Sequence, residues 1–528
     1  MAAVYRPPST IHLNPYFLAK TPSDRLFKLI KSLSSSEKRY FKIFVNSKGG
    51  KDNKYTLLFD TIDALEIFDE ELLKATIYKN QKIESRKYSE LKAYLYDLIL
   101  KSLQLYDEKT SVDYRLKNML LNIRVLFRRA HFVDAQIMVS KAEKLARKYE
   151  DFNTLLELLR WKKEIAYAST DITYLDEELT QIAQIEKEYL TKLTNIAAYR
   201  NIFFRLLVIL RKGSNFRKEQ PTVFNEIIEH PLLQKEQFAN TYTAKIQYYR
   251  ILSLHAYATL QWEKFYDYGK LLLEMLESQS FRLKEDVSEY ISALSNFVLS
   301  CSVLQRYDSM AEYLEKFKKI KPNTLDDELK IHRQYYLNKL EWCCRTGDFA
   351  EGLTTLHAHL KEKKKFAGDF FNTSSYQFYY FYIYFGNAKY NEALNALNDW
   401  LNAPKEAERE ELQSLARIFN LMIHYKLNNS LLLESLIRSA ERFLQKQTKV
   451  YQYELLLIKT IKLAEKAVSK KELSGQLEAI KKELTQLRET PMERAMLQYF
   501  PWSAWLTSLT SDSSFAEIVQ RDYQELNN

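Results

Sequence analysis

The chain has 528 residues and a formal net charge of +10, with only 9 glycines and 10 prolines beside 37 tyrosines and 29 phenylalanines. Sheet proteins and nucleotide-binding α/β folds need many glycines for tight turns and phosphate loops, so this composition argues against both. Apolar residues make up 46% and charged residues 28% of the chain, which is ordinary globular usage and excludes wholesale disorder. We therefore expect an all-α protein.

Residues 1–20 contain prolines and show no helical periodicity, so we expect an N-terminal arm there. The same stretch lacks the charged segment and apolar run of a signal peptide. No uncharged apolar run approaches the roughly 20 residues that span a bilayer. Three cysteines are too few for a disulfide framework and indicate a reducing compartment. These features predict a cytoplasmic protein without membrane insertion.

Residues 21–110 are predicted to form a basic helical N-terminal module. An apolar stripe at helical spacing is followed by a capping box from Ser34 to Glu37. Residues 20–54 hold ten lysines and arginines against three acidic residues, a local charge of +7. One hypothesis is an anion or nucleic-acid patch, and the alternative is a solvated, lysine-rich helical face. The patch would consist of Lys28, Lys31, Lys38, Arg39 and Lys42.

Residues 111–488 repeat a unit of two helices joined by a short turn that contains an aromatic residue. Four of these aromatics, Trp262, Tyr307, Phe349 and Tyr390, lie 45, 42 and 41 residues apart. A fixed period of about 20 to 50 residues is typical of solenoids. We therefore predict an α-solenoid of helix hairpins over this range.

The turns HFVDA, GDFAEG and AKYNEA resemble the inter-helix turn of tetratricopeptide repeats, in which an aromatic precedes a small residue by three positions. The pairs are Phe132 with Ala135, Phe349 with Gly352, and Tyr390 with Ala393. The period is longer than the usual ~34 residues, and the first-helix position that is small in that family is bulky here (Leu340, Phe381). The N-terminal module and the FPWSAWLTSL segment also resemble an uncharacterised group of bacterial helical-repeat proteins, which implies no function.

Residues 374–385 read SSYQFYYFYIYF, with aromatics on every side of a helical wheel. β-propensity favours a strand locally. However, N-cap candidates precede the stretch, and Gly386, Asn387 and a repeat turn follow it. We interpret it as the first helix of a repeat, covered on all sides. Some tyrosines of such helices are expected on the concave wall as partner-binding residues: Tyr249, Tyr336, Tyr380 and Tyr384.

Residues 489–528 are predicted to form a C-terminal cap. Pro491 and Pro501 break the repeat pattern, and Trp502, Trp505 and Leu506 then follow at i, i+3 and i+4. This spacing predicts a short helix that packs back on the preceding repeat. A solenoid needs such an end piece because its last repeat otherwise exposes an apolar face.

Motifs for catalysis or cofactor binding are absent from the sequence, including the dinucleotide, phosphate-loop, zinc-protease and serine-hydrolase patterns. Cys343 and Cys344 with His357 and His359 form the one constellation that suggests a metal. Adjacent cysteines point about 100° apart on a helix, so we interpret them as core thiols rather than ligands. We therefore predict no enzyme activity, no metal and no cofactor.

Two hypotheses for function follow. The first is a non-catalytic scaffold or adaptor that binds a peptide or helix of a protein partner in the concave face of the superhelix. The alternative is a nucleic-acid- or ribosome-associated adaptor that acts through the basic N-terminal module, whose binding would weaken steeply as salt rises.

Overall fold

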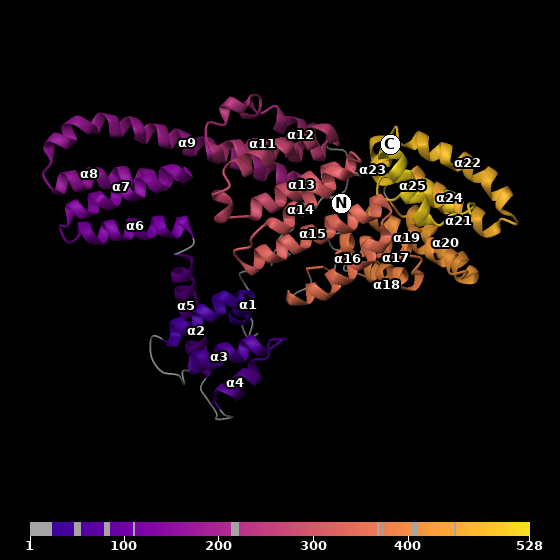
Figure 1. Cartoon of the computed structure of the whole chain (residues 1–528), viewed down its shortest axis with the longest axis horizontal. Coiled ribbons are helices and arrows are strands. Elements are labelled where there is room, and N and C mark those ends of the chain that lie inside the picture. The colour runs from indigo at the N-terminus through magenta and orange to yellow at the C-terminus, as the bar shows by residue number, and fades with distance from the viewer. Residues whose placement is uncertain are drawn as a thin grey trace.

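The computed structural model describes residues 24–46, 54–78, 85–108, 111–212, 221–366, 370–371, 373–402, 410–447 and 450–527. Within these ranges the chain is helical throughout and contains no strand. Successive helices pack against their neighbours in chain order, so the predicted all-α solenoid is confirmed (Figure 1). The predicted arm, residues 1–20, lies outside the described residues.

The N-terminal helices surround a hydrophobic core of their own, which includes Ile30, Phe41, Phe59 and Ile99. Figure 1 shows them projecting from the row of later helices, to which α5 connects them. The predicted capping box is present, because the carboxylate of Glu37 accepts the Ser34 N–H at 2.7 Å. The helices are α1 (Arg25–Ser32), α2 (Ser35–Asn46), α3 (Lys54–Ala64), α4 (Glu70–Tyr78) and α5 (Ser85–Asp107).

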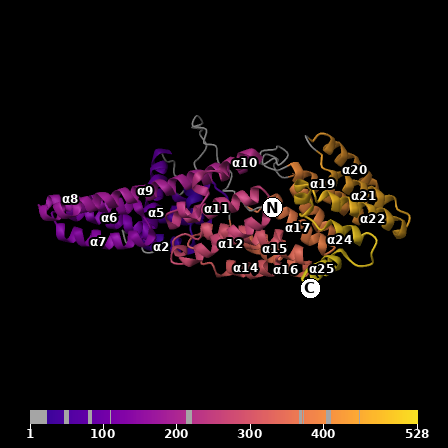
Figure 2. The same ribbon diagram turned by 90° about the horizontal axis from the view of Figure 1, so that it is seen from above.

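The solenoid follows as a row of helices along the long axis of the molecule, from α8 near one end to α22 at the other (Figure 2). Short 3-10 turns η1 (Pro231–Leu233), η2 (Glu236–Phe238), η3 (Arg282–Lys284) and η4 (Lys363–Lys365) join some of the helices. The helices are α6 (Val112–Phe127), α7 (Phe132–Tyr149), α8 (Phe152–Ala168), α9 (Ile172–Lys212), α10 (Pro221–Ile228), α11 (Tyr242–Ala258), α12 (Trp262–Ser278), α13 (Ser288–Val303), α14 (Tyr307–Lys319), α15 (Leu325–Thr346), α16 (Phe349–Glu362), α17 (Ser374–Gly386), α18 (Tyr390–Asn402), α19 (Glu410–Lys426), α20 (Ser430–Gln445), α21 (Gln452–Lys466) and α22 (Lys470–Leu487).

The aromatic turn residues of the sequence mark where second helices begin. α12, α14, α16 and α18 start at Trp262, Tyr307, Phe349 and Tyr390. Two residues before each start, the backbone adopts a left-handed conformation, with φ between 56° and 77°. In three of these turns, the N–H of the following residue donates to the carbonyl five residues earlier, at 2.8 to 2.9 Å. This is the hydrogen-bond pattern of a Schellman helix end. One turn geometry therefore recurs along the solenoid.

The aromatic stretch 374–385 forms α17, and its prediction as a buried helix is confirmed. Phe378, Phe381 and Tyr382 are almost fully buried. The Phe381 ring lies 4.6 Å from Phe419 of α19, between ring centroids, and Tyr382 lies 4.8 Å from Phe500. Helices on both sides of α17 in the chain, α15, α16, α18 and α19, pack against it, which explains why it has no polar face.

The C-terminal helices are α23 (Pro491–Leu497), α24 (Trp502–Ser508) and α25 (Phe515–Asn527). Trp502 and Trp505 are buried. α25 returns along the solenoid, since Phe515 lies 5.8 Å from Phe349 and Tyr523 lies 5.6 Å from Tyr307, again between ring centroids. Figure 1 shows these helices between the middle of the row and α22, where they pack against α15, α21 and α22 and cover two earlier repeat turns.

One helix in the described part of the chain, α9, is long and apolar enough by length and composition to cross a membrane. One of its faces packs on the protein, because the Tyr199 hydroxyl donates to the Leu232 carbonyl at 2.6 Å and the Arg250 guanidinium lies 4.0 Å from the Phe203 ring centre. The prediction of no membrane insertion remains a prediction.

Candidate functional site

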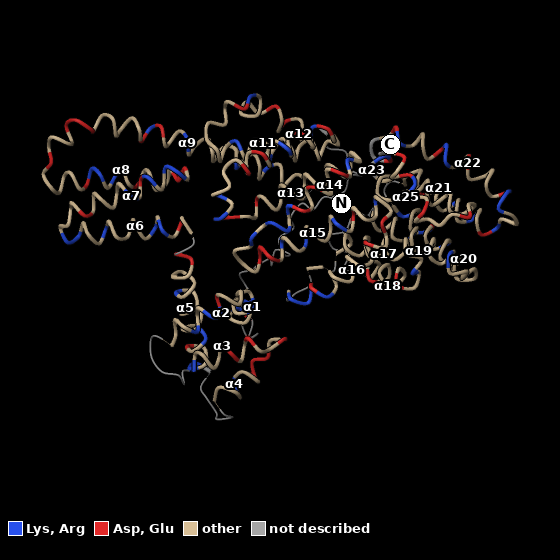
Figure 3. Tube along the Cα trace, viewed as in Figure 1, with Lys and Arg blue, Asp and Glu red and all other residues tan. Residues whose placement is uncertain are grey.

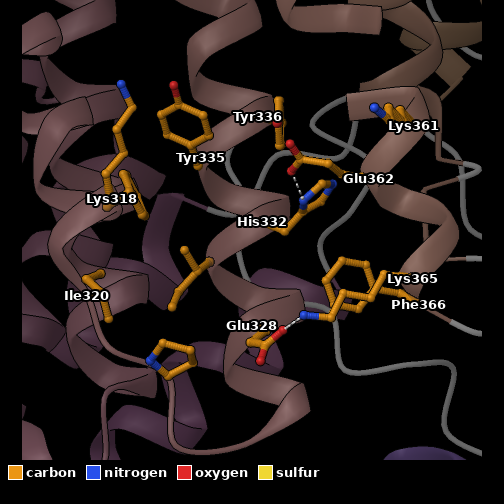
Figure 4. A pocket seen from close by; sticks show the side chains of 13 residues that line it. Lys318, Ile320, Glu328, His332, Tyr335, Tyr336, Lys361, Glu362, Lys365 and Phe366 are labelled. Atoms are coloured by element: carbon orange, nitrogen blue, oxygen red, sulfur yellow. Dashed lines mark hydrogen bonds and ion pairs between the residues drawn. The ribbon is translucent and has the colours of Figure 1, made fainter. Parts of the chain in front are cut away.

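A pocket of about 640 Å³ lies between the end of α14, the first half of α15 and the end of α16 (Figure 4). α15 supplies its floor through residues at i, i+3, i+4, i+7 and i+8, which is one face of a helix. The lining side chains are Phe317, Lys318, Ile320, Pro322, Glu328, Ile331, His332, Tyr335, Tyr336, Lys361, Glu362, Lys365 and Phe366.

The pocket has an apolar interior. Phe317, Ile320 and Ile331 supply aliphatic and aromatic carbon, and the rings of Tyr335 and Phe366 extend it. Most binding pockets combine such an apolar lining with a few polar groups that fix the orientation of the ligand. The polar groups here come from three lysines, two glutamates and His332.

Lysines dominate the rim. The chain segments 316–321 and 361–365, which end α14 and α16, contain eight lysines and one glutamate. Figure 4 shows Lys318 and Lys361 on opposite sides of the α15 side chains. Lys365 forms an ion pair with Glu328, and Lys318 pairs with Glu315 of its own helix at 2.7 Å. Elsewhere, Lys and Arg positions are interspersed with Asp and Glu positions along most helices (Figure 3).

A chain of hydrogen bonds leads from the core to this pocket. Tyr380 Oη lies 2.6 Å from His359 Nε2, and His359 Nδ1 lies 3.0 Å from His332 Nε2. On the pocket side, His332 Nδ1 lies 3.7 Å from a carboxylate oxygen of Glu362. The two imidazoles therefore connect α15, α16 and α17.

The carboxylate of Glu362 bears on which ring nitrogen donates in each of these hydrogen bonds. The Glu362 carboxylate, 3.7 Å from His332 Nδ1, attracts the ring proton to that nitrogen and favours the tautomer in which His332 Nε2 accepts from His359 Nδ1–H. His359 Nε2 is then free to accept the hydroxyl of Tyr380. Three of the four ring nitrogens are thereby hydrogen-bonded when both rings are neutral.

Burial keeps both rings neutral. Desolvation lowers the pKa of His332, and nearby Lys365 lowers it further. Desolvation, His332 and Lys363 together lower the pKa of His359. Desolvation also raises the pKa of Tyr380 above its ordinary value of 10.0.

The four tyrosines predicted to bind a partner lie at different depths. Tyr249, Tyr336 and Tyr380 are buried, while Tyr384 is half-buried. Burial and nearby Glu236 raise the pKa of Tyr249 to about 12, and burial and nearby Glu362 raise the pKa of Tyr336. Of the four, Tyr336 lines the pocket, and the histidine chain links it to Tyr380. Tyr249 lies on α11, in a different repeat.

The predicted basic patch lies on α1 and α2, and most of its charges have partners. Lys28 pairs with Asp24 at 2.7 Å, Lys38 with Asp63 at 2.7 Å, and Lys42 with Asp60 at 2.8 Å. The ammonium of Lys31 donates to the Asp63 carbonyl at 2.7 Å. Arg39 is exposed. Lys48 and Lys51 of the same charge run lie outside the described residues.

The cysteine and histidine constellation does not come together. Cys343, Cys344 and His359 are buried, whereas His357 is exposed. His359 points to His332 and Tyr380 rather than to the thiols. Within the described ranges, no group of three or more cysteine, histidine or acidic side chains is placed to hold a metal ion.

Apart from Tyr336, the residues that build the pocket are not predicted from the sequence. The sequence suggests His359 only as a metal ligand, and no motif marks His332 or Glu362. The two lysine runs are readable as charge runs, and Lys316 and Lys361 lie 45 residues apart, one repeat period. That spacing could have placed both runs at equivalent ends of successive second helices.

The fold and this site define an all-helical solenoid with an aromatic, lysine-rimmed pocket between two of its repeats. Comparison with protein-family models, with curated proteins and with solved structures finds no match.

Proposed function

We propose that the chain is a non-catalytic protein–protein interaction scaffold, built of tetratricopeptide-like repeats, that binds a peptide or helix of a protein partner. The observation that supports this function is the pocket between α14, α15 and α16, which is aromatic inside and mixed in charge at its rim. Helical-repeat proteins use surfaces shared by successive repeats to bind extended partners. We place the protein in the cytoplasm, and its resemblance to a bacterial group suggests a bacterial source.

Buried aromatic and aliphatic anchors provide most of the binding energy of peptide interfaces. The interior of the pocket, with Phe317, Ile331 and Tyr335, offers a place for one such anchor. Because the lining comes from two consecutive repeats, a bound peptide would touch both and follow the row of helices.

The chemistry near the pocket favours binding over catalysis. Both imidazoles are occupied by each other and by Tyr380 and Glu362, so neither is placed against a nucleophile. Burial raises the pKa of the Cys343 thiol to about 12, which makes it a poor nucleophile at neutral pH.

A second candidate is the nucleic-acid- or ribosome-associated adaptor. The local charge of +7 over residues 20–54 and the exposed Arg39 favour it. The ion pairs of Lys28, Lys38 and Lys42 reduce the field that this charge would project toward phosphates.

Site-specific photo-crosslinking tests the proposed function. A photoreactive amino acid replaces exposed Lys361 at the pocket rim or, as a control, exposed Lys482 of α22. After irradiation in the native cell, each variant is purified with and without nuclease. The scaffold hypothesis expects a discrete protein adduct from position 361, insensitive to nuclease and absent from position 482. Adducts that disappear with nuclease, or no adduct at position 361, would contradict it.

A further inference from the structure

We propose that the pocket between α14, α15 and α16 binds an acidic peptide segment that inserts an apolar side chain. This inference rests on the proposed scaffold function and specifies the chemistry of the partner. It follows from three features of the site: the apolar interior, unmatched positive charge beside it, and an exposed carboxylate that can accept a hydrogen bond.

The interior selects an apolar anchor. A pocket of about 640 Å³ lies within the range that proteins use for ligands, and its walls at Phe317, Ile331 and Phe366 offer no hydrogen bonds from their side chains. A polar anchor would lose its hydration there without compensation. Leucine or phenylalanine has no polar side-chain group to dehydrate, and its burial there removes apolar surface from water.

The surroundings of the pocket select negative charge. Lys361 lines the pocket, and Lys319, Lys321 and Lys364 are chain neighbours of lining residues. All four are exposed, and no carboxylate in the described part of the chain lies within 4.0 Å of their ammonium groups. Partner carboxylates could therefore bind them without breaking an internal ion pair. Glu328, by contrast, is already paired with Lys365.

Helix dipoles alone do not account for these lysines. Cations in the last turn of a helix are stabilised by its dipole, and this explains Lys319 and Lys361. Lys321 and Lys364 lie beyond the ends of α14 and α16. Two basic runs therefore extend past the helix ends on opposite sides of the pocket, in the arrangement that charge-complementary recognition requires.

Glu362 gives the site an orientation. Its side chain is 57% exposed and lies 3.7 Å from His332 Nδ1 of α15. From this exposed position the carboxylate can accept a backbone N–H of the peptide but repels side-chain carboxylates. The acidic side chains of the partner are thus directed to the lysines on either side.

The proposal is tested with the full chain and fluorescein-labelled peptides in fluorescence anisotropy. The probe is Glu-Glu-Leu-Phe-Glu-Glu. One matched peptide has glutamine for glutamate, a second has serine for Leu-Phe, and a uridine oligonucleotide provides an acidic polymer without an anchor. The first peptide should bind more tightly than the other three probes, with an affinity that falls as salt rises. Equal binding of the glutamine peptide, the serine peptide or the oligonucleotide would overturn the proposal.

Variants locate the binding. The double variant Lys321→Glu/Lys361→Glu should weaken binding of the acidic peptide by roughly tenfold or more, because two attractions become repulsions. Lys471→Glu/Lys482→Glu on α22 makes the same change in net charge at exposed positions and should leave affinity within about twofold. Equal losses in both variants would refute the site. Crosslinking of a native protein at position 361 without preference for the acidic peptide would refute this inference and leave the scaffold function standing.

Discussion

His332 Nε2 and His359 Nδ1 lie 3.0 Å apart in the core between α15 and α16, and both rings are almost fully buried. Two imidazoles at this distance form one hydrogen bond when neutral and repel each other when protonated. The pair therefore makes this part of the solenoid sensitive to acid.

The first prediction concerns pH. The pKa of His332 falls from 6.5 to about 4 on folding, because burial disfavours the charged ring. The unfolded chain therefore binds more protons between these values, and the stability of the protein should drop as pH falls from 6.5 toward 4. The pKa of His359 falls to about 3, so its contribution extends the loss to about pH 3. The charged or titratable groups around the pair are Glu328, Tyr336, Glu362, Lys363, Lys365, Tyr376 and Tyr380.

Thermal unfolding monitored by circular dichroism at pH 7 and pH 5 measures this effect. The variant His332→Asn/His359→Asn cannot titrate at these positions. Its melting temperature should therefore fall less from pH 7 to pH 5 than that of the unmodified chain. Burial also lowers the pKa of His255 and His424, so some pH dependence should persist in the variant. An identical pH dependence in both proteins would contradict the assignment.

The second prediction tests one hydrogen bond, the bond between Tyr380 and His359. Tyr380→Phe removes the hydroxyl that His359 Nε2 accepts and leaves a buried acceptor unsatisfied. We expect a loss of about 1–3 kcal/mol in the free energy of unfolding. Tyr384→Phe, one turn further along α17, is the control, because that side chain is half-buried and should cost less. Equal effects of the two substitutions on denaturant unfolding would argue against the hydrogen bond.

Much of the fold was predictable because the repeat turn has a local signature. Trp262, Tyr307, Phe349 and Tyr390 each begin a helix, and the aromatic stretch 374–385 is a buried helix between them. The return of α25 onto Tyr307 and Phe349 was not predictable, since ring contacts between distant segments leave no local pattern in the sequence. The length of α9, 41 residues, departs from the repeat altogether.

The candidate site was less predictable than the fold. Aromatic residues of first helices were expected on the concave wall, yet packing against neighbouring helices buries Tyr249 and Tyr380. The pocket instead depends on where the ends of α14 and α16 lie relative to α15. That placement follows from how two repeats pack in three dimensions. Spacing in the sequence indicates it only for the two lysine runs.

The third prediction concerns a helix cap made by a distant carboxylate. Glu493 accepts the N–H groups of Gln452 at 2.8 Å and Tyr453 at 3.2 Å, so it satisfies the start of α21 from α23. Because Glu493 is buried, Glu493→Ala should cost about 2 kcal/mol or more in the free energy of unfolding. Glu517 caps α25 locally through the Ser514 N–H at 2.7 Å, and Glu517→Ala at that exposed cap should cost less. Urea unfolding of both variants measures the difference, and a smaller effect at Glu493 would refute the cap.

The fourth prediction tests the close approach of helices at a repeat turn. A Cβ added at Gly352 of α16 would collide with the Ile383 side chain of α17 and lie 3.1 Å from Cys343 Cβ of α15. The end of the isoleucine can rotate, but the cysteine Cβ is fixed to its helix, so α15 and α16 would have to separate. Gly352→Ala should therefore destabilise the protein by about 1–3 kcal/mol, despite the higher helix propensity of alanine.

Gly475→Ala is the matched control, because a Cβ at this position of α22 meets nothing within 4 Å. Alanine should there stabilise the helix by up to about 1 kcal/mol. Denaturant unfolding should thus shift in opposite directions for the two glycine variants. A stabilising Gly352→Ala would mean that α15, α16 and α17 pack less tightly at this turn than their side chains indicate, and the small residue three positions after Phe349 would have no steric role.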